Sequence, residues 1–146
     1  MSSIAAVPAE RERQRIAAYG LVRDDEDRLL LARAAPLLSV RGRWFLPGGG
    51  VQHGEKPMDS LRREIAEESG LTVVPGALLD VLSDVRTIPD GTSLHTVRLI
   101  FEVASWHGSL RPEVDGTTDA VAWFSLDEAR DLPLARYVET VVGRLV

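Results

Sequence analysis

Residues 49–71 constrain the fold of this chain more than any other part of the sequence. The segment opens with glycines, passes through a loop that carries Glu55, and continues into a stretch with helical periodicity. Pro57 suits the first turn of a helix, where its missing N–H costs nothing. Gly70 suits the left-handed position just beyond the last turn. We therefore predict a glycine-rich loop followed by a helix over Pro57–Ser69.

The predicted helix carries three carboxylates on one side. Successive residues of a helix turn by about 100°, so Glu64, Glu67 and Glu68 share a face, and Glu55 can reach it from the loop. Like charges at helical spacing cost about 0.2–0.5 kcal/mol, and anions near a helix C-terminus are further disfavoured. A divalent cation would reverse this repulsion, because Mg²⁺ takes oxygen ligands and shares them with phosphates. The pattern indicates a metal site for a diphosphate; the alternative is a solvated acidic face.

Two neighbouring features favour the metal site. The run Gly48–Gly50 carries no Cβ, so its backbone N–H groups can approach phosphate oxygens, although glycines also form plain turns into helices. Arg63 stands between the loop acid and the helix acids. We interpret it as a partner that orients Glu55 or Glu64 through a charge-assisted fork. The alternative is an ordinary surface ion pair.

The same residues match the pattern G-x5-E-x7-R-E-U-x-E-E-x-G-U, in which U is an aliphatic residue. This pattern resembles the Nudix box, the signature of hydrolases that split nucleoside diphosphates linked to another moiety. The resemblance implies an α/β/α sandwich, with a mixed sheet flanked by helices, and hydrolysis of a phosphoanhydride by water with Mg²⁺ or Mn²⁺. It assigns metal binding to Glu67 and Glu68, with assistance from Glu55. It makes Glu64 a further ligand or the base that deprotonates water, and it places Arg63 in the catalytic set.

Residues outside the box add candidate contacts. Aromatic side chains can stack on a nucleobase, and the candidate stacking surfaces are Tyr19, Trp44 and Phe45. Arg98 can line a cleft from the polar face of its strand. Core packing and a half-exposed sheet face are the respective alternatives. In similar proteins a loop before the last strand supplies an extra acid, and the candidates here, each of which can equally lie in a solvated loop, are Glu113, Asp115 and Asp119.

The rest of the sequence predicts one mixed domain. Apolar runs and alternation favour extended segments at about residues 16–23, 29–32, 43–46, 72–83 (broken at Pro75-Gly76), 94–104 and 120–124. Ser125 can cap a helix that starts at Leu126, and a last helix is expected over residues 135–145. Residues 1–14 are expected to form an N-terminal arm, and residues 15–146 a single Nudix hydrolase domain.

Composition narrows the partners. The 146 residues carry a net charge of -5 and no cysteine. This disfavours nucleic acid polymers and anionic membranes as partners, and it excludes disulfides and thiolate zinc sites. No run is long and apolar enough to span a bilayer, and the charged N-terminal region does not resemble a signal peptide. We therefore expect a cytoplasmic protein that binds a small nucleotide. Paired domains are common in the family that the box resembles, which leaves a homodimer open.

Substrate markers downstream of the box favour nucleoside triphosphates. The proline of many ADP-ribose hydrolases is expected near Arg86 or Thr87, and Pro89 is close to that position but does not occupy it. The tyrosine of many dinucleoside polyphosphate hydrolases is expected near Ile88 or Pro89 and is absent there. In its size and in residues 44–47 the chain is similar to small MutT-like members, which favour nucleoside triphosphates. The alternatives are an ADP-ribose or other nucleotide-sugar pyrophosphatase, and a non-catalytic domain that senses a nucleotide.

Overall fold

The computed structural model describes residues 11–36 and 41–145 of the chain. Its strands and helices follow one another in the order that the sequence predicts. Their order is β1 (Glu12–Leu21), β2 (Leu29–Ala34), β3 (Trp44–Phe45), β4 (Gly48–Gly50), α1 (Pro57–Ser69), β5 (Thr72–Thr87), β6 (Ser93–His107), β7 (Thr118–Phe124), α2 (Leu126–Arg130) and α3 (Arg136–Arg144).

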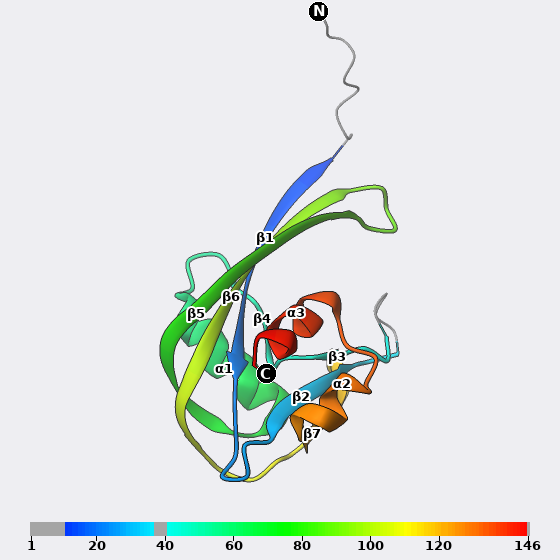
Figure 1. Ribbon diagram of the computed structural model, residues 1–146. Helices are drawn as coiled ribbons and strands as arrows, with labels where there is room; N and C mark the ends of the chain where they lie inside the picture. Colours follow the sequence, from blue (N-terminus) through cyan, green and yellow to red (C-terminus); the bar gives the residue numbers. More distant parts are fainter. Residues whose placement is uncertain (1–10, 37–40, 146) are drawn as a thin grey trace, which may run out of the picture.

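The strands form two sheets. One has the order β4-β1-β6-β5 and the other the order β3-β2-β7. The β1–β6 pair is parallel and every other pair in the larger sheet is antiparallel, so the predicted mixed sheet is confirmed. Figure 1 shows α1 and α3 as separate layers beside the strands, which confirms the predicted helix-flanked architecture.

Alternation along β1 divides the hydrophobic core in two. Ala17, Tyr19 and Leu21 point into a core that α3 completes. Ala18 and Val22 point into a second core, completed by α1. Because successive side chains of a strand face opposite sides, one strand holds both helices in place. The active-site helix is thereby fixed against the strand that lies next to β4.

The long strands exceed their predicted bounds. β1 begins at Glu12, because residues 12–15 pair with residues 93–96 of β6; part of the expected N-terminal arm therefore belongs to the sheet. β5 runs through Pro75 with shifts in register, which an edge strand tolerates because it does not need every N–H. Figure 1 shows the β5–β6 hairpin and the start of β1 projecting together from the rest of the molecule.

The helices follow their sequence signals closely. α1 has the predicted bounds, with Leu61 and Ile65 buried and Gly70 at φ 78 donating its N–H to the Ala66 carbonyl. Met58, which the helical stripe placed inside, is 43% exposed. It lies in the first turn, beyond the reach of the core. At the start of α2 the predicted capping box between Ser125 and Glu128 is present.

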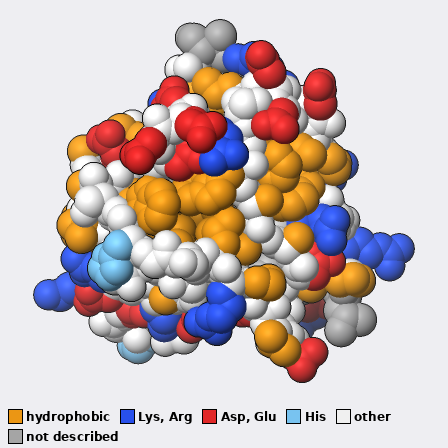
Figure 2. Space-filling view, turned by 90° about the horizontal axis from the view of Figure 1, so that it is seen from below, with side chains coloured by type: hydrophobic (Ala, Val, Ile, Leu, Met, Phe, Trp, Pro, Cys, Tyr) orange, Lys and Arg blue, Asp and Glu red, His pale blue; other side chains and the backbone are white. Residues whose placement is uncertain are grey.

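Hydrophobic side chains are also present on the surface. The view from below the orientation of Figure 1 shows them among acidic and basic side chains (Figure 2). Trp106 and Trp123 are half-buried beside the second core, with ring centroids 5.1 Å apart. Within residues 11–36 and 41–145, no helix has the length and apolar character needed to cross a membrane.

Candidate active site

Strand β4 lets two helix carboxylates approach the backbone closely. The Gly48 N–H donates a 2.8 Å hydrogen bond to the carboxylate of Glu68. A Cβ on Gly49 would lie 2.8 Å from the Cδ atom of Glu64. Gly48 has a φ of 143°, a conformation that side-chain-bearing residues rarely adopt. The glycines therefore make room for acids of α1, and the Gly48 N–H is already engaged by Glu68 and not free for a phosphate.

Arg63 gathers the loop acid and the helix acids. It forms a fork with Glu55, in which Nε donates to Oε2 at 2.9 Å and Nη2 donates to Oε1 at 3.0 Å. Its Nη1 donates to Glu64 at 3.0 Å and to Glu67 at 3.4 Å. Arg63 thus contacts both Glu55 and Glu64, which the sequence suggested as alternative partners. The hydrogen bonds that Arg63 donates to Glu55, with a further one from the backbone of Gln52, lower the pKa of Glu55 to about 2.

Burial acts in the opposite direction on two acids of α1. It raises the pKa of Glu64, an effect that Arg63 partly opposes. It raises the pKa of Glu68 well above its ordinary value, and the charges of Glu64, Glu113 and Glu67 add to that rise while the Gly48 N–H opposes it. Glu68 is only 5% exposed. Burial and the neighbouring acids therefore disfavour the ionised form of both side chains, which a bound cation would favour.

The donor set suits a hard divalent cation. Every candidate ligand is a carboxylate oxygen, which is the chemistry that Mg²⁺ and Mn²⁺ prefer. Glu68 is buried with no cationic partner within the described ranges, and a cation would offset its charge. In the part of the chain that the structure describes, no three acidic or histidine side chains already stand together as a metal cluster. Arg63 instead holds oxygens of three of the four acids.

A cleft of about 980 Å³ opens from these carboxylates. Glu64, Glu68 and the glycines of β4 line one part of it. The half-buried ring of Phe45 adds aromatic surface, and the buried rings of Tyr19 and Tyr137, which are 4.8 Å apart, reach the same wall. The cleft also has basic walls in an otherwise acidic chain. Its arginines are Arg13, Arg15, Arg43, Arg86, Arg98 and Arg136.

The predicted substrate contacts fall in different places. Tyr19 and Arg98 line the cleft. Arg98 donates a 2.6 Å hydrogen bond to Asp84. Its Cζ atom lies over the ring of Tyr137, 4.8 Å from the ring centroid. Trp44 is 9% exposed, packs edge-on against the partly buried Phe124, and does not line the cleft. Because neighbouring strand residues face opposite ways, Phe45 faces the cleft and Trp44 does not.

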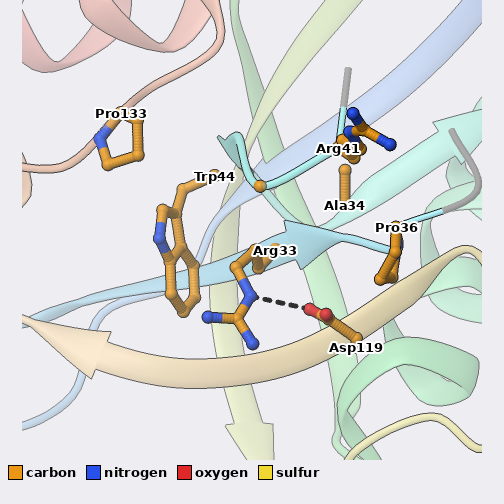
Figure 3. Close-up of a pocket in the computed structure, with 8 residues that line it drawn as sticks. Arg33, Ala34, Pro36, Arg41, Trp44, Asp119 and Pro133 are labelled. Atoms are coloured by element: carbon orange, nitrogen blue, oxygen red, sulfur yellow. Dashed lines mark hydrogen bonds and ion pairs between the residues drawn. The ribbon is translucent and has the colours of Figure 1, made fainter. Parts of the chain in front are cut away.

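Trp44 belongs to a second, shallower pocket of about 520 Å³. Figure 3 shows its indole beside Arg33 and Pro133, with Arg33 reaching across to Asp119. The Arg33–Asp119 ion pair is 2.7 Å long. None of the acids of α1 lines this pocket. The structure therefore places Trp44 and Asp119 together in this second pocket, apart from the acids of α1.

Of the three candidate extra acids, Glu113 lies beside the site. Its Oε1 accepts hydrogen bonds from the Thr118 N–H at 3.1 Å and the Thr118 hydroxyl at 2.9 Å, and Thr118 lines the cleft. Its charge also contributes to the raised pKa values of Glu64 and Glu68. Asp115 is exposed at a turn with a φ of 55° and does not line the cleft.

Sequence reasoning missed several residues of the cleft. Arg13 and Arg15 share the strand parity of Tyr19, which was a candidate contact. Their side chains therefore face the same side of β1. Extending the strand four residues towards the N-terminus would have identified them. No comparable indication is present in the sequence for Tyr137, because a tyrosine that lies among valines in a helix is expected to pack in the hydrophobic core.

Comparisons with known proteins agree with this geometry. The NUDIX domain family model matches residues 13–141. Nucleoside triphosphatase NudI of Klebsiella pneumoniae (strain 342) is 32% identical over 129 residues, which are 84% of this chain and 89% of NudI. The human 8-oxo-dGDP phosphatase NUDT18 is 31% identical over 102 residues, which are 68% of this chain but 29% of NUDT18. A crystal structure of a MutT NUDIX hydrolase from Burkholderia pseudomallei superposes with a TM-score of 0.77 at 26% identity, covering 91% of this chain and 98% of that one. The chain therefore belongs to the Nudix family and is a Nudix hydrolase.

Proposed function

We propose that this Nudix hydrolase cleaves a phosphoanhydride bond of a nucleoside triphosphate with the aid of Mg²⁺ or Mn²⁺. The observation that carries the proposal is the joining of two opposite electrostatic regions in one cleft. Carboxylates of α1 that lack sufficient countercharge line one part, and arginines and aromatic rings line the rest. A polyphosphate with a bound cation matches both regions, and a nucleobase matches the half-buried ring of Phe45.

Glu67, Glu68 and Glu64 would hold the metal, with Glu55 and Glu113 close enough to assist. Such an ion offsets negative charge on the phosphoryl oxygens and lowers the pKa of bound water. Arg63 keeps Glu55, Glu64 and Glu67 turned towards one another. Glu64 retains two roles, as a further ligand or as the acceptor of the proton of the attacking water.

The triphosphate is preferred over a nucleotide sugar for two reasons. The similarity to proteins named nucleoside triphosphatase NudI extends over 84% of this chain. Six arginines line the same cleft as Glu64 and Glu68, which suits a chain of charged phosphates. The likeness to an ADP-ribose pyrophosphatase from Streptococcus suis, with a TM-score of 0.59 at 21% identity, concerns the fold alone.

The test is a hydrolysis panel of nucleoside triphosphates, nucleoside diphosphates and ADP-ribose. Each is assayed with Mg²⁺, with Mn²⁺ and with EDTA. We expect triphosphates to be turned over fastest and EDTA to abolish turnover. A wild-type protein that binds nucleotides tightly but hydrolyses none would contradict the proposal and favour a nucleotide-sensing domain.

The variant Glu67→Gln tests the metal site. It removes a ligand charge from a half-exposed side chain, so we expect turnover to fall by about a hundredfold with an unchanged melting temperature, on the scale of losses seen when single catalytic groups are removed. Asp59→Asn is the matched control, because Asp59 lies on the same helix and pairs with Arg62 outside the cleft. Full activity in Glu67→Gln would remove the assignment of this residue.

A further inference from the structure

Arg15 lies directly against the glycine strand of the active site. The position that a Cβ of Gly50 would occupy is 3.4 Å from both Nε and Nη2 of Arg15. On its other side, the Gly50 carbonyl accepts hydrogen bonds from Ser60 at 3.3 Å and from Arg63 at 3.4 Å. Gly50 therefore separates two guanidinium groups. Arg63 faces the carboxylates, and Arg15 faces the cleft.

The charge of Arg15 lacks a partner in the ranges that the structure describes. Arg63 pairs with three carboxylates and Arg98 with one, but no ion pair of Arg15 is found there. Arg15 is nevertheless half-buried, whereas Arg13 on the same strand face is exposed. Withdrawing a guanidinium from water without an opposite charge is unfavourable. A bound anion in the cleft would compensate it through charge-assisted hydrogen bonds.

The order of strands fixes where that anion would lie. The strands run β4-β1-β6-β5, and neighbouring strands are about 4.8 Å apart. Arg15 on β1 pairs in register with Thr96 on β6, which in turn pairs with Asp84 on β5. All three line the cleft. Arg15 is thus one strand spacing from β4 and the carboxylates, on the side that leads towards β5.

We propose that Arg15 is a phosphate-binding residue, which holds a phosphate of the substrate chain next to the one held at the carboxylates. This inference rests on the proposed function and deepens it, because it requires a substrate with adjacent phosphates. The planar guanidinium can donate two parallel hydrogen bonds to one phosphate. A Cβ at position 50 would only just reach van der Waals contact with this guanidinium, so glycine leaves the group open to the cleft.

The experiment compares Arg15→Ala and Arg15→Lys with the control Arg62→Ala. Arg62 is an exposed arginine of α1 that does not line the cleft. Calorimetric titration with inorganic tripolyphosphate and Mg²⁺ measures phosphate binding without a nucleobase. A charge-assisted hydrogen bond contributes enough for about a tenfold effect on affinity. We therefore expect about tenfold weaker binding in Arg15→Ala, recovery of part of that loss in Arg15→Lys, which keeps the charge but not the fork, and no change in Arg62→Ala.

Steady-state kinetics on the best triphosphate provide the second readout. Loss of binding shared by the ground state and the transition state raises KM and leaves kcat nearly unchanged. We expect that split in Arg15→Ala, together with a weaker dependence of KM on salt. Wild-type affinity for tripolyphosphate in Arg15→Ala, or a Lys variant as impaired as the Ala variant, would overturn the inference. Arg15-dependent binding of tripolyphosphate by a protein that hydrolyses no nucleotide would sustain it while refuting the proposed function.

Discussion

Replacing Gly49 by alanine tests whether the close approach of β4 and α1 sets the position of Glu64. Gly49 is not among the glycines with a positive φ, so its backbone conformation accepts alanine. The added Cβ would lie 2.8 Å from Cδ and Oε2 of Glu64 and 3.0 Å from Oε1. The carboxylate is the movable end of a side chain. We therefore expect the strand to stay and the carboxylate to shift.

The size of the shift follows from the contact distances. To pass from 2.8 Å to an ordinary contact at 3.4 Å, the carboxylate must move by about 0.6 Å. That movement also disturbs the 3.0 Å hydrogen bond from Arg63. Catalytic groups must be held within about 0.5 Å of their working geometry, and a misplacement of about 1 Å can cost about a hundredfold. We expect kcat to fall by about ten- to a hundredfold, while the free energy of unfolding changes by about 1 kcal/mol or less.

The assay measures kcat and KM for the best triphosphate at saturating Mg²⁺, together with unfolding in urea. Gly143→Ala is the matched control, because a Cβ at Gly143 on α3 meets no heavy atom within 4 Å. Alanine in a helix is favoured over glycine by about 0.5–1 kcal/mol, so this control should be slightly stabilised and fully active. If Gly49→Ala kept kcat within twofold of wild type, the contact with Glu64 would not set catalytic geometry.

Two further predictions concern stability. Gly48→Ala combines a φ of 143° with a Cβ only 2.1 Å from the Ala18 carbonyl oxygen, so urea unfolding should show a loss of about 2–5 kcal/mol; a loss below about 1 kcal/mol would contradict the described path of β4. Glu68→Gln should stabilise the metal-free protein at neutral pH. Burial raises the folded-state pKa of Glu68. The contribution of this side chain to the stability of the folded protein is therefore complete below its ordinary pKa near 4.5, and it is lost as the pH rises through the raised pKa. Melting curves at pH 5 and pH 8 should show the advantage of the variant widening with pH, and a constant difference would refute this account.

The parts of the fold that could be predicted from sequence depend on local signals. Pro57 and Gly70 mark the two ends of α1 because their backbone preferences act within one turn. The capping box at Ser125 likewise needs only residues three apart. The grouping of acids around Arg63 follows from helical spacing and a short loop. These features were predicted because the partners are close in sequence.

The features that were missed depend on pairing across the chain. The polar residues 12–15 form a strand because they pair with residues 93–96, which lie about 80 positions away in the sequence. No alternation of apolar residues in the sequence indicates this pairing. The choice between Trp44 and Phe45 depends on the register of β3, since a shift of one residue exchanges the two faces of a strand. Arg15 enters the active site only once β1 lies beside β4. The start of β1, the orientation of Trp44 and Phe45, and the position of Arg15 are therefore all determined by strand pairing and not by the local preferences of the residues.

The acidic residues of α1 persist because the packing of neighbouring apolar residues outweighs unfavourable electrostatics. The last turn of the helix holds acids and no basic residue, which opposes the helix dipole. Leu61 and Ile65 are fully buried beside Glu64 and Glu68, and each such apolar side chain contributes about 1.5–3 kcal/mol, against a few tenths for each charge contact. The apolar stripe can therefore hold Glu64 and Glu68 at positions that their own charges disfavour. A cation that binds them stabilises the folded state by mass action, so metal affinity and the stability of this helix should rise together.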